Sequence, residues 1–288
     1  STPSNSSAAS DVYKRQACGN SDAASMFKMN NLCNQYGIDV SDYGCVIACA
    51  MEWYEKEIIT KKDTDGISLE WGNAEALVQV LHKVAKREGF GDLLAEGAVK
   101  AAEKLGKGAL DYVSYSKGLA WGVDDIRVLK GYGLCCATST RGADHLRGLP
   151  GAEFTGLVSK EEAKKKFGSE DSIIPNSWDK SGIVVYYQNA LATIDALEIC
   201  KFDTEWIWGI PFANIIEAYN SLTGEDLDEK CFLEVGERIY NVERAYLARE
   251  GITRKDDELK GRWGKDAVAE GKYKGERIDP QKFNKLLD

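Results

Sequence analysis

The stretch from Leu227 to Glu250 most constrains the fold of this chain, because it is a long and uninterrupted helical pattern. Its apolar side chains recur at spacings of four, four, three and four residues, and Gly251 supplies a stop. These apolar positions are Cys231, Val235, Ile239, Val242 and Tyr246. At about 1.5 Å per residue the helix spans roughly 35 Å, the width of a domain. With only 5 prolines in 288 residues, the chain favours long helices over a β fold.

Shorter helical patterns occupy much of the remaining sequence. One covers residues 73–88, with Asn73 as its N-cap and Gly89 as its stop, and the next runs from Asp92 as a cap to Gly106. Residues 45–58 and 208–220 also have helical spacing. The run IVVYY at residues 183–187 is β-branched and aromatic, which is typical of a strand, although a helical pattern follows it directly. We therefore predict an all-α fold, which a sheet of four or more strands would contradict.

Composition and charge exclude several classes of function. The formal net charge of −9 argues against binding to a phosphate backbone, which needs a basic stripe. The chain has no run of 18 apolar residues, so we expect no membrane span. Its opening, STPSNSSAAS, lacks the apolar region of a secretory signal, which indicates a cytoplasmic protein. Residues 1–16 are typical of translated adapter sequence, and we leave them out of the fold.

The eight cysteines point to metal binding, catalysis or burial rather than to disulfides, because a reducing cytoplasm is expected. Cys45 and Cys49 lie one helical turn apart, which suits a metal, but the run VIACAMEWY around them favours packing in a helix. The adjacent Cys135 and Cys136 are also predicted to pack. The sequence contains neither a CxxC pair nor an HExxH helix, which argues against a zinc site.

The segment ATSTRGADHLRG, residues 137–148, places charged side chains among small residues that let a ligand approach the backbone. Its histidine, His145, is a candidate for proton transfer because imidazole titrates near neutral pH. A structural histidine bonded to a carboxylate such as Asp144 is an equally open alternative. The only other histidine, His82, is predicted to lie on the face of a helix.

Two short segments far apart in the sequence share one spacing. CNQYGID has Asn34, Gly37, Ile38 and Asp39 at offsets 0, 3, 4 and 5. DALEIC has Asp195, Glu198, Ile199 and Cys200 at the same offsets. The similarity suggests equivalent roles on the two sides of one ligand, although windows this short also match by chance. From the residues alone, the Cys200 thiol is a buried small residue, a nucleophile or one ligand of a metal centre.

Six segments in order resemble the tungsten-containing aldehyde ferredoxin oxidoreductases. They are CNQYGID, REGFGDLLAEG, KGLAWGVDDIR, GYGLCCATSTRGADHLRG, IDALEICKF and NVERAYLAREGITRKDDEL. The resemblance covers nearly all of residues 17–288 and falls on the helical C-terminal two-thirds of such enzymes. It implies two helical domains, residues 17–113 and 114–288, the second truncated at its C-terminal end.

The resemblance also implies a cofactor and its ligands. The family binds tungsten between two pyranopterin dithiolenes, a molybdopterin-type cofactor, beside a [4Fe–4S] cluster. Asp39 and Asp195 match carboxylates that each hold one pterin, while Asn34 stands where the family often has Asp. Cys200 matches one cluster ligand. His145 matches a histidine beside the tungsten, and Arg147 occupies a basic position two residues further on.

The activity implied is oxidation of a small aldehyde to a carboxylic acid, with electrons passed through the cluster to ferredoxin. The family's N-terminal domain, with three further cluster cysteines, lies upstream of the matched region, so we expect this chain to be a fragment that is inactive alone. The resemblance leaves a homodimer open. Departures at Ala120, Gly122, Ile126 and Glu198 keep a second reading open, a reductive member acting on another carbonyl or acyl substrate. A cofactor-free helical interaction module is a third.

Overall fold

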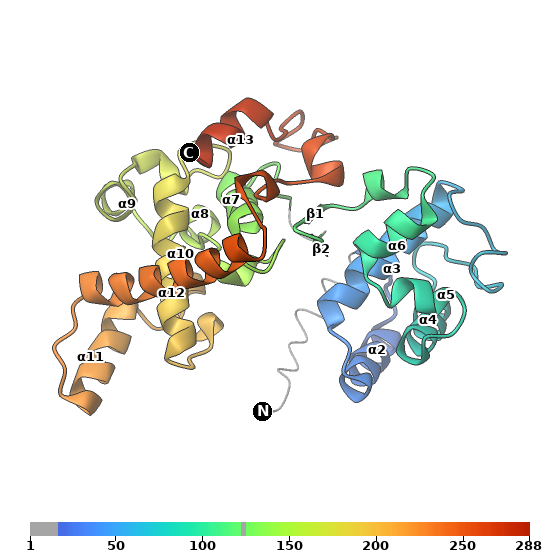
Figure 1. The fold of residues 1–288 in the computed structure, drawn as a ribbon, viewed down its shortest axis with the longest axis horizontal. Coiled ribbons are helices and arrows are strands. Elements are labelled where there is room, and N and C mark those ends of the chain that lie inside the picture. The colour runs from blue at the N-terminus through green and yellow to red at the C-terminus, as the bar shows by residue number, and fades with distance from the viewer. Residues whose placement is uncertain (1–16, 122–124) are drawn as a thin grey trace. The chain divides into compact units, whose positions relative to one another are not determined.

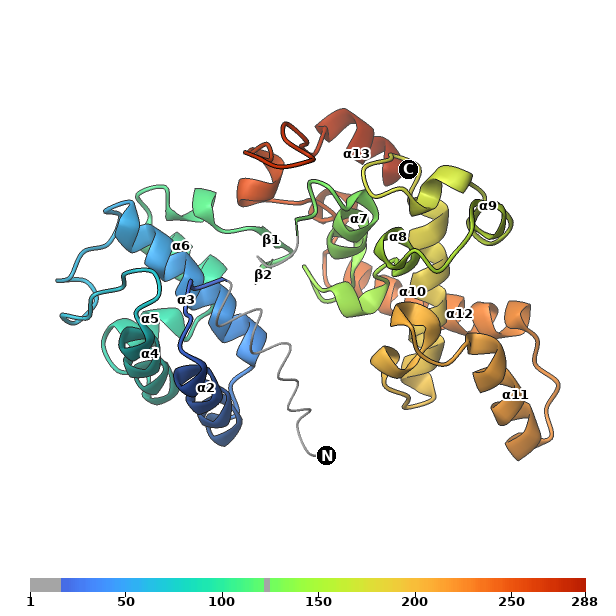
Figure 2. The same cartoon turned by 180° about the vertical axis from the view of Figure 1, so that it is seen from behind.

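The computed structural model describes residues 17–121 and 125–288, and these residues are predominantly helical (Figures 1 and 2). The only sheet among them is a hairpin of two-residue strands, β1 (Tyr115–Ser116) and β2 (Leu119–Ala120), paired antiparallel. The predicted all-α class is therefore confirmed. Within the described residues no helix combines the length and the apolar character needed to cross a bilayer. The opening 16 residues and Gly122 lie outside the described part of the chain.

The chain divides into two compact units. The first holds the described part of residues 1–124 together with Lys260–Arg262, and the second holds residues 125–259 and 263–288. The return of the late segment to the first unit is fixed by a β-bridge between Tyr115 and Lys260 and by an ion pair between Arg262 and Glu52.

The first unit is a cluster of helices around one apolar core. Its elements are α2 (Ala23–Tyr36), α3 (Val40–Glu55), α4 (Ala74–Lys86), α5 (Phe90–Leu94), α6 (Ala98–Leu105), η2 (Ala109–Tyr112) and the hairpin. Trp53 of α3 lies at the centre with no exposed surface, and its indole Nε1 donates to the Ala109 carbonyl at 3.0 Å. Gly91 lets α5 approach the backbone of α4, since a Cβ there would lie 2.2 Å from the Lys83 carbonyl carbon.

The second unit is built around α10. Its elements are α7 (Lys130–Thr138), η3 (His145–Arg147), α8 (Ala152–Thr155), α9 (Lys160–Phe167), η4 (Glu170–Ile173), α10 (Ser181–Ala196), η5 (Lys201–Asp203), η6 (Glu205–Ile207), α11 (Phe212–Thr223), α12 (Glu229–Arg249), η7 (Arg254–Asp256) and α13 (Pro280–Leu286). The short η8 (Gly261–Gly264) is divided between the units after Arg262. Helix α12 crosses α10 closely at Gly236, where a Cβ would lie 1.8 Å from the Asn189 carbonyl oxygen (Figure 1). The Thr193 hydroxyl of α10 reinforces this crossing by donating to the Phe232 carbonyl at 2.7 Å.

A buried ion pair joins three helices of the second unit. The Glu153 carboxylate of α8 accepts from the backbone N–H groups of Gly131 and Tyr132 at the start of α7, at 3.0 and 3.1 Å. The same carboxylate lies 2.9 Å from Lys180 Nζ, and neither side chain is exposed. Burial raises the pKa of Glu153 and lowers that of Lys180, while the pairing and, for Glu153, the backbone donors oppose these shifts.

Several local predictions are confirmed. Helix α4 begins after Asn73, whose side chain accepts from Ala76 N, and α12 begins after the cap Asp228. Helices α3 (Val40–Glu55) and α11 (Phe212–Thr223) cover most of the predicted stretches 45–58 and 208–220, but not residues 56–58 or 208–211. His82 lies on α4, as predicted, and its Nδ1 is 2.8 Å from the Tyr36 hydroxyl.

Other predictions are wrong for identifiable reasons. Residues 183–187 form part of α10 and not a strand, because a helix buried on most sides is apolar all round and burial overrides β propensity. The predicted helix from Asp92 to Gly106 is two helices, separated by a left-handed Gly97 at φ 83°. The apolar stripe of α12 is not its buried face, since Val242 and Tyr246 are 69% and 56% exposed.

Candidate functional site

The histidine segment forms a compact turn between α7 and α8. Asp144 precedes η3 and caps it by accepting from Leu146 N at 3.0 Å, while the same carboxylate accepts from Arg141 Nε at 2.7 Å. Asp144 therefore shapes the turn. The half-buried His145 ring stacks between Tyr132 and Trp206, with centroid distances of 6.0 and 6.1 Å. Two aromatic faces thus fix the plane of the imidazole.

Arg147 belongs to a chain of charges that links three parts of the second unit. Its guanidinium Nη1 lies 3.5 Å from Asp195 Oδ2, at the end of α10, and 3.0 Å from Glu243 Oε1, on α12. The Thr140 hydroxyl donates to the other oxygen of Glu243 at 2.6 Å. Lys201 Nζ, on η5, reaches the same Asp195 oxygen at 2.8 Å and also donates to the Leu146 carbonyl.

Asp195 is therefore held by two cations while its side chain stays 42% exposed. Both cations contact Oδ2, which leaves the other oxygen able to accept from a ligand. Sequence reasoning had not identified Lys201 and Glu243. Lys201 directly follows the candidate Cys200, and this adjacency was the one available signal. No local pattern marks Glu243, because its role comes from the crossing of α12 over α10.

Cys200 is exposed and precedes η5 without a side-chain capping bond. The loop that follows carries three exposed apolar side chains, Phe202, Trp208 and Ile210, which are 57%, 63% and 51% exposed. Of the three roles left open for this thiol, burial as a small apolar residue is excluded. An exposed thiol beside a buried lysine fits a nucleophile or a metal ligand.

Asn34 and Asp39 lie in the first unit, at the junction of α2 and α3. Asp39 is the N-cap of α3, and its Oδ1 accepts from Asp42 N at 2.8 Å. It also lines a pocket of about 280 Å³ with Tyr36, Asp42 and Arg87. Burial, with the nearby Asp39 charge, raises the pKa of Asp42. Asp39 thus has a structural role that explains its presence without any cofactor.

The two short segments of similar spacing have the same local backbone. In the first, Gly37 is left-handed at φ 67°, Gly37 N donates to Asn34 O, and Ile38 N donates to Cys33 O. In the second, Glu198 is left-handed at φ 59°, Glu198 N donates to Asp195 O, and Ile199 N to Ile194 O. The paired hydrogen bonds, with a left-handed residue between helix and exit, are those of a Schellman motif.

The agreement extends to the last residue of each segment. Asp39 has φ −64° and ψ 127°, and Cys200 has φ −65° and ψ 124°. Each begins a new helix. By position in the motif, Asn34 is therefore the equivalent of Asp195, and Asp39 the equivalent of Cys200. The predicted similarity is real at the level of backbone geometry.

The second unit brings most of the candidate residues together. Arg147 contacts Asp195, His145 lies two residues before Arg147, and Cys200 precedes the lysine that binds Asp195. The two remaining candidates, Asn34 and Asp39, belong to the first unit, so the hypothesis that the two segments flank one ligand stays a prediction.

The remaining cysteines follow the packing prediction in part. Cys135 and Cys136 have no exposed surface, as predicted. Cys45 is buried but Cys49 is half-buried, and both border a pocket rather than a closed helix interface. Cys45 is therefore buried as predicted, and Cys49 packs against the core of the first unit while also facing the pocket.

An iron–sulfur cluster and a pterin place different demands on these residues. Among residues 17–121 and 125–288, no group of three or more His, Cys, Asp or Glu side chains could hold a metal ion. A cubane needs about four thiolates, so these residues fit the cluster only as a source of the single Cys200 ligand. For a pterin the fit is better, because the half-exposed Asp195 carboxylate can accept from a donor edge.

Comparison with known proteins identifies the relatives of this chain. The family model described as aldehyde ferredoxin oxidoreductase, domains 2 & 3, matches residues 15–288. The tungsten-containing aldehyde ferredoxin oxidoreductase of Pyrococcus horikoshii is 33% identical over 261 residues, which are 89% of this chain and 41% of that protein. The Pyrococcus furiosus protein of the same name is 32% identical over 262 residues, 90% of this chain and 41% of that protein.

Two further similarities are more distant. The aliphatic sulfonate oxidoreductase, WOR-like subunit, of Pyrococcus furiosus is 29% identical over 244 residues, 80% of this chain and 33% of that protein. Among solved structures, the active site complex BamBC of benzoyl coenzyme A reductase with 1,5 dienoyl-CoA matches with a TM-score of 0.70. That match covers 97% of this chain and 44% of the other at 20% identity, and it shows the fold alone. The chain spans about two fifths of the length of its first relatives.

Proposed function

We propose, from the premise that this chain belongs to the aldehyde ferredoxin oxidoreductase family, that it supplies the helical part of a tungsten–pterin oxidoreductase. The reaction proposed is aldehyde plus water to carboxylic acid, with release of two electrons and two protons. Tungsten held by two pterins would accept the electron pair, and ferredoxin would receive the electrons through a [4Fe–4S] cluster. The protein is proposed to act in the cytoplasm.

The observation that carries this proposal is the arrangement around Asp195. A carboxylate fixed by Arg147 and Lys201 is held in one orientation, with an oxygen left for the amino and ring N–H donors of a pterin. Cys200 lies five residues further on, at the surface, where its thiolate can bind one iron of a cluster. In this proposal, the rigid turn between α10 and η5 fixes the separation of the proposed pterin ligand, Asp195, from the proposed cluster ligand, Cys200.

In the first unit the same motif supports Asn34 as the counterpart of Asp195. An amide offers one carbonyl oxygen to a donor edge, without charge, so this pterin would be held more weakly than the other. Asp39 was proposed for this role from the family resemblance, and its carboxylate keeps one oxygen beyond the helix cap. Both residues remain proposed cofactor contacts.

His145 is proposed to move the proton. Its imidazole is held between Tyr132 and Trp206, so the ring keeps one plane while its charge changes. The neighbouring Arg147 carries a fixed positive charge on the same turn. A general acid or base that cannot rotate is well suited to one proton path.

The proposal is tested on this chain and on a longer protein that extends it upstream, both produced anaerobically with tungstate. We expect the longer protein to contain iron and tungsten and to reduce a viologen dye when aldehyde is added, and this chain alone to be inactive. Cys200→Ser in the longer protein should lose iron and dye reduction. Cys231→Ser, which changes a half-buried thiol on α12, is the matched control.

Three results would count against the proposal. Unchanged iron content in Cys200→Ser would remove that thiol from the cluster. Oxidation of reduced viologen on addition of an acyl thioester, with no dye reduction by any aldehyde tested, would favour the reductive reading. A longer protein that folds and takes up neither metal would favour the helical interaction module.

A further inference from the structure

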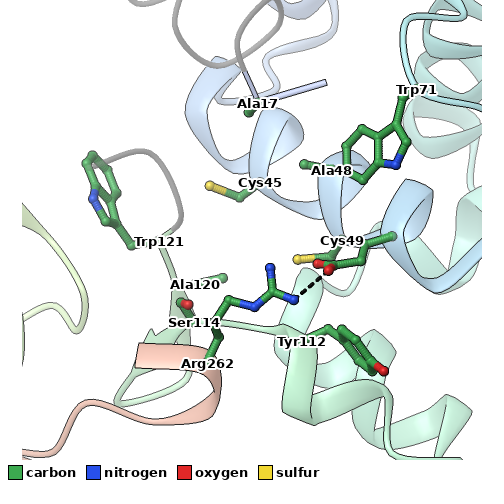
Figure 3. Close-up of a pocket in the computed structure, with 11 residues that line it drawn as sticks. Ala17, Cys45, Ala48, Cys49, Trp71, Tyr112, Ser114, Ala120, Trp121 and Arg262 are labelled. Carbon is green, nitrogen blue, oxygen red and sulfur yellow. Dashed lines mark hydrogen bonds and ion pairs between the residues drawn. The ribbon is translucent and has the colours of Figure 1, made fainter. Parts of the chain in front are cut away.

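Helix α3 turns two thiols and one carboxylate toward the same pocket. Cys45, Cys49 and Glu52 lie at spacings of four and three residues, which places them on one face of the helix. All three line a pocket of about 130 Å³. Figure 3 shows both sulfur atoms on the side of α3 that faces Ala120 and Arg262.

The spacing of the two thiols favours a bridging ion over a disulfide. Side chains four residues apart on a helix have Cβ atoms about 5–6 Å apart, whereas a disulfide needs about 3.5–4.5 Å. Neither cysteine is oxidised. A linear sulfur–metal–sulfur unit needs the two sulfurs about 4.6 Å apart, twice a metal–sulfur bond of about 2.3 Å. Two adjacent turns of one helix can meet that distance by side-chain rotation.

The surroundings select the kind of ion. No third His, Cys, Asp or Glu completes a metal-binding group with this pair among the residues that the structure describes. Ions that need three or four protein ligands, such as Zn²⁺, are therefore disfavoured. Soft thiolate ligands favour Cu(I), which accepts two of them. The pocket has room for one ion and a few waters, each with a share of about 30 Å³.

The charged side chains of the pocket suit the complex that Cu(I) would form with the two thiols. A Cu⁺ ion that displaces two thiol protons leaves a bis-thiolate complex with one net negative charge and two protons in solution. Arg262 lines the same pocket and already pairs with Glu52, so a cation is present to offset that charge.

We propose that Cys45 and Cys49 form a two-thiolate site for a soft, two-coordinate cation of the Cu(I) type. The site uses only the first unit, and none of its residues takes part in the proposed oxidoreductase chemistry. It is therefore independent of the proposed function.

The test is a competition titration of this chain with Cu(I) and the chelator bicinchoninate, under anaerobic and reducing conditions. We expect native protein to bind one Cu(I) at least about 100-fold more tightly than Cys45→Ser/Cys49→Ser, because loss of both thiolates removes every strong donor of the site. Cys231→Ser should bind like the native chain. X-ray absorption should report two sulfur neighbours. Equal affinity in the double variant and the native chain, with equal far-UV circular dichroism, would overturn the proposal.

A second measurement covers the case in which the double variant does not fold. Folded native protein with one equivalent of Cu(I) is treated anaerobically with iodoacetamide for long enough to alkylate Cys45 and Cys49 of the metal-free chain, and is then unfolded and mapped by mass spectrometry. Joint protection of Cys45 and Cys49, absent without Cu(I), is expected. Protection of other cysteines, or equal protection by Zn²⁺, would refute the site or its ion class.

Discussion

The segments Cys33–Asp39 and Ile194–Cys200 share one backbone and differ in what their side chains do. Each leaves a helix through a left-handed residue and enters another through a residue with φ near −65°. In the first, that entry residue is a carboxylate that caps α3. In the second it is an exposed thiol with no capping bond. The backbone motif thus places a residue without deciding whether it is used for structure or for chemistry.

The two segments also differ at the equivalent residues Asp195 and Asn34. Asp195 is bound by two cations, Arg147 and Lys201, whereas the equivalent Asn34 is exposed and uncharged. The second segment is therefore held from outside by its neighbours, and the first is held by its own helix caps. We infer that the second segment is the more rigidly positioned of the two.

The largest expected difference is in thiol reactivity. Cys200 is exposed, whereas Cys33 has no exposed surface. Iodoacetamide should modify Cys200 at least about 100-fold faster, because Cys33 requires an opening that costs about 3 kcal/mol or more. Peptide mapping over time measures both rates in one sample. Comparable rates would mean that α2 opens freely and that burial does not protect Cys33.

The next largest effect concerns the first residue of each motif. Asp195→Ala should lower the free energy of unfolding by about 1–3 kcal/mol, because it leaves the buried Lys201 without its carboxylate. Since Asp195 is 42% exposed, the lower half of that range is expected. Asn34→Ala should change stability by less than about 0.5 kcal/mol. Urea unfolding followed by circular dichroism measures both changes in stability. Adding Lys201→Met to the Asp195→Ala variant should recover part of its lost stability, because it removes the cation left without a carboxylate.

Substitutions of the left-handed residue, Gly37 in the first segment and Glu198 in the second, should affect stability differently. Gly37→Ala should cost about 1–2 kcal/mol through backbone strain alone, because a Cβ there would meet nothing within 4 Å. Glu198→Gly removes a similar strain but adds freedom to the unfolded chain, so it should be neutral or stabilising by about 0.5 kcal/mol. Gly224→Ala, at another open left-handed glycine that ends a helix, is a control for Gly37. A destabilised Glu198→Gly would show that the Glu198 side chain contributes contacts of its own.

The smallest change in stability is expected for the residue that begins the next helix, Asp39 in the first segment and Cys200 in the second. Asp39→Ala should cost about 1 kcal/mol through loss of the N-cap of α3, and Asp39→Ser should retain most of the stability. Cys200→Ala should change stability by less than about 0.5 kcal/mol, since its side chain is exposed and caps nothing. Differential scanning calorimetry resolves these shifts. If Cys200→Ala is the more destabilising, the thiol has a structural role.

The helices that the sequence predicts best are those with explicit ends. Asn73 caps α4 as expected, and α12 begins at Glu229, close to the predicted start, after the cap Asp228, because a capping side chain is a local signal. The strand prediction for residues 183–187 failed because the local preference of β-branched residues is overridden when α10 becomes the buried centre of a unit.

The candidate site was predictable in its motif and not in its contacts. Asp195 and Cys200 follow from a repeated spacing and a family resemblance. Lys201 and Glu243 become relevant only through the fold, because Glu243 reaches Arg147 from a helix 96 residues further along the chain. The exposure of Val242 and Tyr246 could not be predicted either, since the close approach at Gly236 decides which face of α12 is buried.

The ion pair between Glu52 and Arg262 has a consequence for biosynthesis. The two residues are 210 positions apart, so at about 5–20 residues per second the ribosome needs about 10–40 s to add the second partner. During that interval the pocket beside α3 lacks the residue that closes it, and the first unit stays incomplete. The nascent chain therefore passes through a period in which Cys45 and Cys49 are open to solvent oxidants and metal ions, a period that chaperone binding or faster translation would shorten.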